Sequence, residues 1–328
     1  MKKTYKVMSS AALAGALLLG TAWGAAEAAG PTAAATSAAK SGGTLSAAKA
    51  KAPSVTQQGI TLEISQAIYD GNYVGITLKR SGKGLTGEIN GKYDEKTHDY
   101  IYEKGAIKDL KLFIDGKSAY EYGGGKSMSQ RPSIVWEPGA TPDTMKISMV
   151  DPSWLGGSLK AFPDKFKLTA KVTLEGVDKP YTLTMTLQKT KGKALKPNLT
   201  KKRGDYSVTL SKLNVTSTST RVQLIEKRLD KNKSSHIMYE AVDDQGNEIA
   251  MISGHGSDEN NKNGDTYNDF VFSASGKGAK SITIKAFEPD FVPNNPNDPN
   301  SPGIFKTDNN GKLIKNYIKE LEMTVKVK

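Results

Sequence analysis

Residues 59–78 read GITLEISQAIYDGNYVGITL, and their layout returns in residues 206–224, YSVTLSKLNVTSTSTRVQL. An apolar period of two is typical of a strand that lays one face on a core. Each stretch predicts a strand, a break and a second strand, and the pair predicts two domains of related topology. Placed over each other without gaps, the stretches have apolar or aromatic residues at 60/206, 62/208, 64/210, 67/213, 69/215, 76/222 and 78/224.

The same period continues in both halves of the chain, for example in FKLTAKVTL (166–174) and SITIKAF (281–287). Turn signals such as Asp70-Gly71 separate the apolar runs. Many short strands at this spacing are typical of a sandwich. We therefore predict an all-β protein with two immunoglobulin-like antiparallel β-sandwich domains in tandem, at residues 55–193 and 204–328. One short helix is the alternative for residues 311–321, where leucine and tyrosine recur every four positions.

The N-terminal 29 residues have the three parts of a signal peptide: a basic start, a short apolar run and small residues before Gly30. Residues 30–54 follow as an Ala-, Ser-, Gly- and Lys-rich stretch, which we interpret as a flexible linker. The chain has no cysteine, which excludes disulfides, a lipidated cysteine and thiol catalysis. We expect a secreted protein, extracellular or associated with a Gram-positive cell wall, with no transmembrane segment in the mature chain.

Positive charge is spread along the chain. Removing residues 1–29 takes away three lysines and one glutamate, which lowers the net charge from +12 to +10. Nucleic-acid-binding modules concentrate their charge more strongly, so we expect no nucleic acid as a partner. The densest basic stretch contains no acid, and residues 194–203 within it are predicted as the linker between the domains. Its basic residues considered as ligand contacts are Lys189, Lys191, Lys193, Lys201, Lys202 and Arg203.

Two interpretations of that basic stretch remain open. It binds an anionic polymer such as teichoic acid, or it is a solvated hinge kept extended by repulsion between its own charges. Aromatic residues of the first domain suggest a further ligand class, since exposed rings can stack on sugars. Trp154, between Pro152 and two glycines, is the ring expected to be most exposed. The aromatic residues considered for this role are Tyr100, Tyr102, Tyr120, Tyr122, Trp136 and Trp154.

Catalytic and metal sites find little support in the sequence. The three histidines, His98, His236 and His255, are not spaced as metal ligands. The loop predicted at 258–269 holds four acids but fits a calcium loop only in part, so we expect a polar hairpin loop. We therefore expect no enzyme and no cofactor. Scattered acids leave a hydrolase of wall polymers as the alternative.

A family resemblance adds to these patterns. GITLEISQAIYDGNYVGITL (59–78) resembles the start of an extracellular domain of unknown function that is common in Firmicutes. That domain usually follows the single membrane helix of anti-sigma-factor-like proteins. NVTSTSTRVQL (214–224), VDDQGNEI (242–249) and GKGAKSITIKAF (276–287) resemble the immunoglobulin-like domain of unknown function that often follows it. The resemblance implies a fold and no catalytic residues, and the predicted signal peptide here replaces the membrane helix.

These observations predict a cell-envelope protein that binds or senses without catalysis. The expected partner is an anionic wall polymer or another envelope protein. The alternative is a carbohydrate-binding protein or wall-polymer hydrolase that uses the aromatic residues of the first domain.

Overall fold

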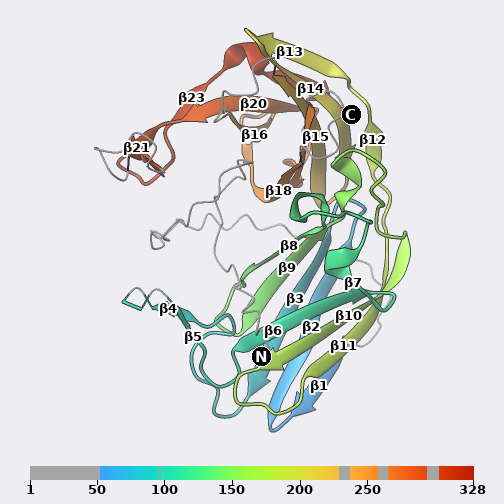
Figure 1. Ribbon diagram of the computed structural model, residues 1–328, viewed down its shortest axis with the longest axis vertical. Helices are drawn as coiled ribbons and strands as arrows, with labels where there is room; N and C mark the ends of the chain where they lie inside the picture. Colours follow the sequence, from blue (N-terminus) through green and yellow to red (C-terminus); the bar gives the residue numbers. More distant parts are fainter. Residues whose placement is uncertain (1–51, 95, 98, 229–236, 258–264, 294–302) are drawn as a thin grey trace, which may run out of the picture.

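The computed structural model describes residues 52–94, 96–97, 99–228, 237–257, 265–293 and 303–328 (Figure 1). Over these ranges the protein is all-β, and its helical elements are four single 3-10 turns. No helix in the described ranges is long and apolar enough to cross a membrane. The predicted all-β fold is confirmed, whereas the predicted signal peptide and nearly all of the 30–54 linker lie outside the described residues.

The first domain is a sandwich of two antiparallel sheets, the blue-to-green half of Figure 1. Its first sheet has the order β1 (Ser54–Gln57), β2 (Ile60–Tyr69), β3 (Val74–Gly82), β9 (Thr144–Val150) and β8 (Ser133–Pro138). Its second sheet has the order β11 (Tyr181–Gln188), β10 (Lys165–Leu174), β6 (Ile107–Ile114) and β7 (Lys117–Ser118). Three 3-10 turns connect these strands: η1 (Ala119–Glu121), η2 (Met128–Gln130) and η3 (Pro152–Trp154).

The second domain repeats this arrangement. Its larger sheet has β12 (Lys193–Leu195) and β13 (Leu199–Arg203) one after the other along β14 (Tyr206–Val215), then β15 (Ser219–Arg228), β19 (Asp265–Ser273) and β18 (Met251–Ser257). Its other sheet has β17 (Glu248–Ile249), β16 (Met238–Asp243) and β20 (Ser281–Pro289), with β20 also pairing β23 (Lys315–Tyr317) and β24 (Met323–Lys326). The turn η4 (Lys319–Leu321) precedes β24.

The two domains share a topology strand by strand. The order β1-β2-β3-β9-β8 corresponds to β13-β14-β15-β19-β18, and β11-β10-β6-β7 corresponds to β24-β20-β16-β17. A β-bulge interrupts the pairing of β2 with β3 between Ile64 and Gln66, and the pairing of β14 with β15 between Leu210 and Lys212. These bulges coincide in the sequence alignment, where Ile64 lies over Leu210. The predicted structural repeat is therefore confirmed down to a local irregularity.

Each domain encloses its own hydrophobic core between its sheets. The alternating residues that decide the sequence pattern lie in these cores: Ile60 and Leu78 are fully buried in the first, and Val208 and Leu224 in the second. Burying apolar side chains is the main driving force for such a sandwich, at roughly 25 cal/mol per Å² of apolar surface. The sequence period thus maps directly onto the inner faces of the sheets.

The predicted linker at 194–203 is different in the structure. Leu199–Arg203 forms β13, which pairs with β14 over five residues, and Lys193–Leu195 forms β12 on the same strand. The stretch is extended because its backbone groups bond to β14, so repulsion between its lysines is not needed to explain its shape. The helix considered for residues 311–321 does not form either. That stretch contains β23 and the short turn η4.

Two hairpins project from the sandwiches on the left of Figure 1. The first, β4 (Lys92–Asp94) with β5 (Asp99–Ile101), leaves the first domain between β3 and β6. The second, β21 (Phe291–Pro293) with β22 (Gly303–Phe305), leaves the second domain between β20 and β23. Neither hairpin belongs to the shared topology, so each is an addition to a common sandwich.

Because the two cores are equivalent, we expect the same substitution at matched positions to lower the free energy of unfolding by similar amounts. We expect Leu78→Ala and Leu224→Ala each to lower the free energy of unfolding by roughly 2–5 kcal/mol, because both leucines are fully buried. The control is Leu199→Ala, at a leucine that is 37% exposed on β13 and should cost far less. Urea unfolding followed by circular dichroism measures all three. A cost at Leu78 or Leu224 no greater than that at Leu199 contradicts the prediction.

Candidate functional site

In the described part of the chain, many of the buried polar side chains lie at the joint between the domains. It forms where the turn after β2 meets the turn after β14, and these turns coincide in the sequence repeat. Asp70 and Asn72 of the first turn are each 1% exposed. A hydrogen-bonded joint of this kind fixes the orientation of one sandwich relative to the other.

Asp70 is the centre of this contact. Its Oδ2 accepts hydrogen bonds from Thr216 Oγ1 at 2.8 Å, Thr218 Oγ1 at 2.6 Å and Ser219 Oγ at 2.5 Å. Its Oδ1 accepts bonds from the backbone N–H groups of Asn72 and Tyr73 in its own turn. The buried carboxylate is thereby satisfied by donors from both domains, as a buried charge requires.

Asn72 makes a second reciprocal contact. Its Nδ2 donates to the Asn214 carbonyl oxygen at 3.1 Å and to Ser219 Oγ at 2.8 Å. In return, Asn214 Nδ2 donates to Asn72 Oδ1 at 2.7 Å. Each domain therefore both donates and accepts hydrogen bonds at this contact, and all of the groups involved are neutral.

A buried ion network lies beside the turns. Arg221 on β15 forms a two-pronged contact with Asp269 on β19, with Nε–Oδ1 at 2.9 Å and Nη2–Oδ2 at 2.6 Å. The same guanidinium reaches into the first domain, where Nη2 donates to the Asp151 carbonyl oxygen at 2.7 Å and Nη1 lies 3.3 Å from Asp151 Oδ2. All three side chains are at most 5% exposed. A paired network of this kind is costly to break from one side.

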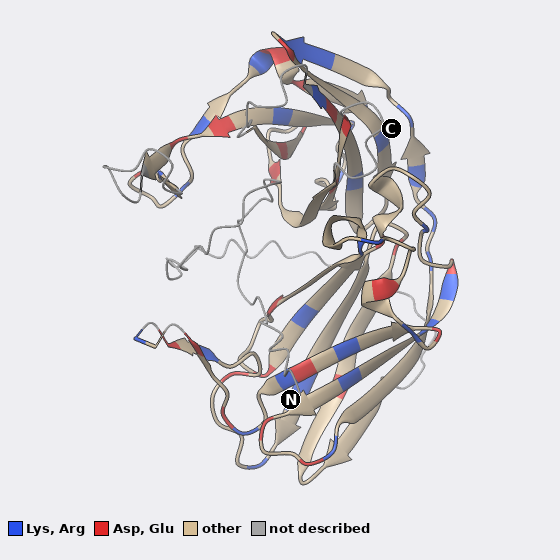
Figure 2. Ribbon diagram, in the orientation of Figure 1, with Lys and Arg blue, Asp and Glu red and all other residues tan. Residues whose placement is uncertain are grey.

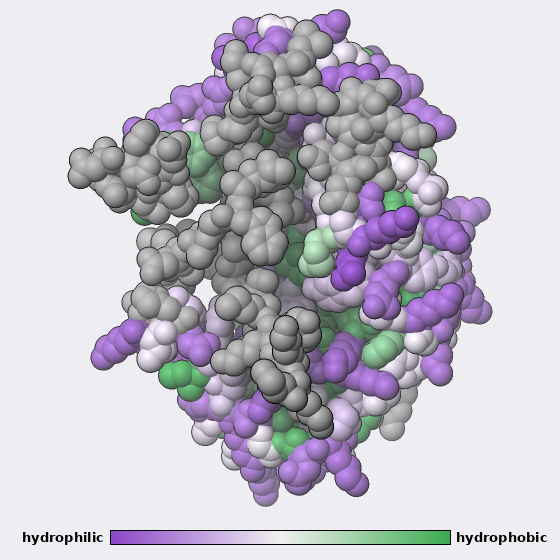
Figure 3. Space-filling model, in the orientation of Figure 1, coloured by the Kyte–Doolittle hydropathy of each residue, from purple (hydrophilic) through white to green (hydrophobic). Residues whose placement is uncertain are grey.

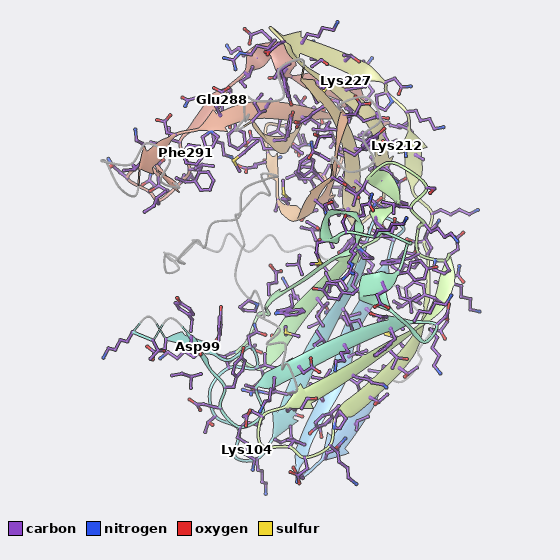
Figure 4. The ribbon with its side chains drawn as sticks, in the orientation of Figure 1. Asp99, Lys104, Lys212, Lys227, Glu288 and Phe291 are labelled. Carbon is purple, nitrogen blue, oxygen red and sulfur yellow. The ribbon has the colours of Figure 1, made fainter. Side chains whose placement is uncertain are left out.

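Trp154 belongs to this network and is not the freely exposed ring that the sequence suggested. Its ring lies under two cations of the second domain, with the Arg221 guanidinium carbon 4.6 Å and Lys212 Nζ 5.6 Å from its centroid. Its carbonyl oxygen accepts a hydrogen bond from Gln223 Nε2. Lys212, labelled in Figure 4, has a lowered pKa because of burial and the nearby Arg221. Trp154 is therefore a half-buried ring of the joint between the domains.

The loop after Trp154 completes the contact. Gly156 has a φ of +81°, and a Cβ atom there would lie 2.8 Å from the ring of Tyr267 on β19. Only glycine permits both this backbone conformation and this close approach. The stretch DPSWLGGS (151–158) thus supplies an ion-pair partner, an aromatic ring and a glycine to the same joint.

The first domain also lies along the edge strand β18. Ser133 Oγ is 3.0 Å from Ser253 Oγ, and Ser129 Oγ is 3.4 Å from Ser257 Oγ. The spacing shows that residues 129–133 run antiparallel to β18. Between these contacts, half-buried His255 bonds to the Ser129 backbone and faces Asp269, while burial lowers the pKa of its imidazole. Covering an edge strand in this way prevents it from pairing with other chains.

These positions decide several sequence interpretations. His255, Ser253 and Ser257 belong to β18 and lie at the joint. Asp269 pairs with Arg221 and does not point to a calcium site. His98, His236 and most of the 258–269 loop lie outside the described residues. Within the described ranges, no three His, Asp or Glu side chains gather as metal ligands.

The six basic residues follow one outer edge, which we call the basic edge and define as residues 189–203 (Figure 2). Lys189 pairs with Asp164 at 2.6 Å, Arg203 pairs with Glu288 at 2.9 Å, and Lys193 donates to the Val327 carbonyl oxygen. Lys191, Lys201 and Lys202 are exposed. All six residues are exposed, and Lys189, Lys193 and Arg203 also make the contacts just described. Figure 3 shows hydrophilic side chains along this outer margin of the molecule.

The other aromatic residues considered as sugar contacts lie in three different environments. Tyr122 packs on Phe162, and Trp136 packs against the first core. Tyr120 is 41% exposed on η1. Tyr100 and Tyr102 come together with Tyr93 on the first projecting hairpin, with ring centroids 6.2 Å and 5.3 Å apart along the row. Sequence reasoning did not include Tyr93, although its place across the hairpin from Tyr100 follows from the strand register.

Comparisons with known proteins add a family and two solved structures. Residues 192–325 match a family of unknown function, DUF5643. This match confirms that the C-terminal half contains a domain of unknown function, as the sequence resemblance implied, and it begins at the start of β12. No curated protein matches the chain.

A conserved domain protein from Bacillus anthracis has a similar crystal structure, with a TM-score of 0.49 and 12% identity, covering 84% of this chain and 89% of that one. Bovine butyrophilin is similar at a TM-score of 0.20 and 8% identity, over 80% of this chain and 95% of that one.

The joint predicts a large effect for removing its cation. Arg221→Ala leaves Asp151 and Asp269 buried without their partner, so we expect it to cost roughly 3–5 kcal/mol of unfolding free energy. Arg203→Ala is the matched control, because its ion pair with Glu288 is about half exposed and should contribute less than about 1 kcal/mol. Urea unfolding measures both. Equal costs for the two variants would show that the buried ion network of Arg221 does not stabilise the protein more than an exposed ion pair does.

The position of His255 predicts a dependence of stability on pH. Burial lowers its pKa in the folded protein, although Asp269 and the Ser129 backbone oppose that shift. The unfolded chain therefore binds more protons as the pH falls below about 6.5, the ordinary value for histidine. We expect stability to fall over that acidic window and His255→Gln to flatten the decline. Thermal unfolding from pH 7.5 to pH 5 provides the measurement, and an unchanged slope in the variant contradicts it.

Proposed function

We propose that this is a secreted binding or sensing protein of a Gram-positive cell envelope that acts without catalysis and contacts anionic wall polymers through the basic edge. The observation that carries the proposal is the series of exposed cationic groups along the basic edge, which includes Lys191, Lys201 and Lys202. The Firmicutes resemblance, the predicted signal peptide and the positive net charge support the setting.

The geometry of this edge suits an extended polyanion. The strands β12 and β13 lie one after the other along β14, which has ten residues. At about 3.3 Å per residue, the edge is roughly 30 Å long. All five residues of β13 are exposed, so its side chains project on both faces of an edge strand. A linear polymer with repeating phosphates can meet such separated charges in sequence.

The rigid joint gives this edge a fixed place on the protein. Because Arg221 and the paired turns hold the sandwiches together, a polymer bound at the second domain also sets the orientation of the first. This arrangement supports a role in presenting the first domain to another envelope component. The resemblance to domains of anti-sigma-factor-like proteins supports that role. The component that contacts the first domain would then be another envelope protein.

The test removes three exposed charges of the basic edge. We expect the variant with Lys191, Lys201 and Lys202 changed to Gln to bind purified teichoic-acid-containing wall about tenfold more weakly, at roughly 0.5 kcal/mol for each exposed contact. The matched control changes Lys165, Lys167 and Lys179, three exposed lysines of the first domain. Retention is measured by sedimentation with the wall over a salt series, since exposed charges are screened over about 10 Å at 0.1 M salt.

Two further comparisons complete the test. Wall stripped of its phosphate polymers should retain the wild-type protein no better than the triple variant. Release of soluble wall fragments during the incubation would instead favour the hydrolase alternative. Equal weakening by the control triple would show that net charge, and not the basic edge, controls retention.

A further inference from the structure

A small hollow opens in the first domain at the base of the β4–β5 hairpin. It has a volume of about 230 Å³, which is below the roughly 300–1,000 Å³ of sites for drug-sized ligands. One wall is the loop that carries Glu88 and Asn90, and the other is the turn from Pro138 to Thr144 between β8 and β9. This hollow belongs neither to the joint between the domains nor to the basic edge.

A buried arginine fixes the two walls. Arg80 is 1% exposed, and its Nε donates to Asp143 Oδ1 at 2.8 Å while its Nη2 donates to the Gly87 carbonyl oxygen at 2.5 Å. A backbone bond from Ile89 N–H to the Pro142 carbonyl oxygen, at 2.8 Å, joins the same two segments. The hollow is therefore preformed, which reduces the entropy lost when a ligand binds.

Two of the residues that line the hollow present hydrogen-bond acceptors. Glu88 is exposed and carries a carboxylate. Asn90 Oδ1 is buried and has no hydrogen-bond partner among the described residues. An unsatisfied buried oxygen of this kind costs roughly 1–3 kcal/mol, and the terminal amide of asparagine turns easily about χ2 to meet a donor. The matching ligand group is a donor, such as a hydroxyl or an amide N–H.

Aromatic rings continue from the hollow along the hairpin. A Cβ atom on Gly91, next to Asn90, would lie 3.0 Å from the ring of Tyr102, which places that ring beside the hollow. Tyr100 and Tyr93 follow in the row described above. The hairpin carries Asp99, labelled in Figure 4, and projects away from the sandwich. The surface therefore has tyrosine rings along the hairpin and polar groups, from Glu88 and Asn90, at the hollow.

We infer that this tyrosine hairpin and hollow bind a neutral or amino-sugar glycan. Sugar rings have apolar faces that stack on tyrosine, and their hydroxyl or acetamido N–H groups donate to Glu88 and Asn90. A phosphate is an anion, which the Glu88 carboxylate repels, so the hollow does not suit the polymer proposed for the basic edge. The protein would thus have two binding surfaces with charges of opposite sign, cationic at the basic edge and carrying Glu88 at the hollow.

Isothermal titration of the full secreted chain with three probes tests this site: chitotetraose, cellotetraose and dextran. About 0.5 M sodium chloride largely screens contacts made by the basic edge. We expect at least one probe to bind, and Tyr100→Ala, Tyr102→Ala and Asn90→Ala each to weaken its binding at least about fivefold. These tyrosines lie outside the hydrophobic core clusters, so the variants should keep their thermal stability.

Two controls keep this inference separate from the proposed function. Tyr120→Ala removes a tyrosine of the same domain that is 41% exposed on η1, and it should leave binding unchanged. The basic-edge triple variant should also bind the glycan normally. Absence of binding to all three probes, or equal weakening by Tyr120→Ala, overturns the glycan site without touching the basic edge. If the basic-edge triple variant loses wall retention but still binds the glycan, the two surfaces act independently and both proposals stand.

Discussion

The arrangement of this protein depends on one buried cation shared between its domains. Arg221 belongs to the second sandwich and pairs there with Asp269, but its remaining donors reach Asp151 of the first. Desolvating a guanidinium and two carboxylates is favourable only when each finds its partner, so the network forms fully when the domains meet in one geometry. Trp154 covers the same guanidinium and excludes water from it. The joint is therefore specific in orientation as well as stable.

The structural repeat shows that this cation has no counterpart in the first domain. In the alignment of the two stretches, Arg221 falls over Gly75, so equivalent strands carry very different residues at one position. At Gly75 there is no room for a side chain, because a Cβ atom would lie 2.8 Å from the Tyr73 ring. The two sandwiches meet through equivalent turns but are not interchangeable. The two projecting hairpins, in contrast, lie outside the common strands, which is where new binding surfaces can arise without disturbing a core.

The sequence predicted the strands and the repeat because one face of each strand needs apolar residues, and that requirement appears as a period of two. It misplaced 194–203 because an exposed edge strand rich in lysine has no apolar alternation and resembles a solvated linker. It also misread Trp154, since a tryptophan between proline and glycines resembles an exposed loop residue until a second domain covers it. The partners Asp151, Arg221 and Asp269 are distant in sequence, so their association follows only from how the domains dock.

Rigid docking gives the two proposed surfaces their combined meaning. The basic edge is cationic, whereas the hollow at the tyrosine hairpin carries the Glu88 carboxylate and is bordered by aromatic rings. A flexible linker would let each domain bind independently, with the effective concentration of the second contact set by the linker's length. Here the joint fixes that separation, so simultaneous binding requires a wall in which glycan and phosphate polymers lie at a matching distance. The buried Arg221 network, which contacts neither ligand, would in this way control the selectivity of both surfaces for one composite target.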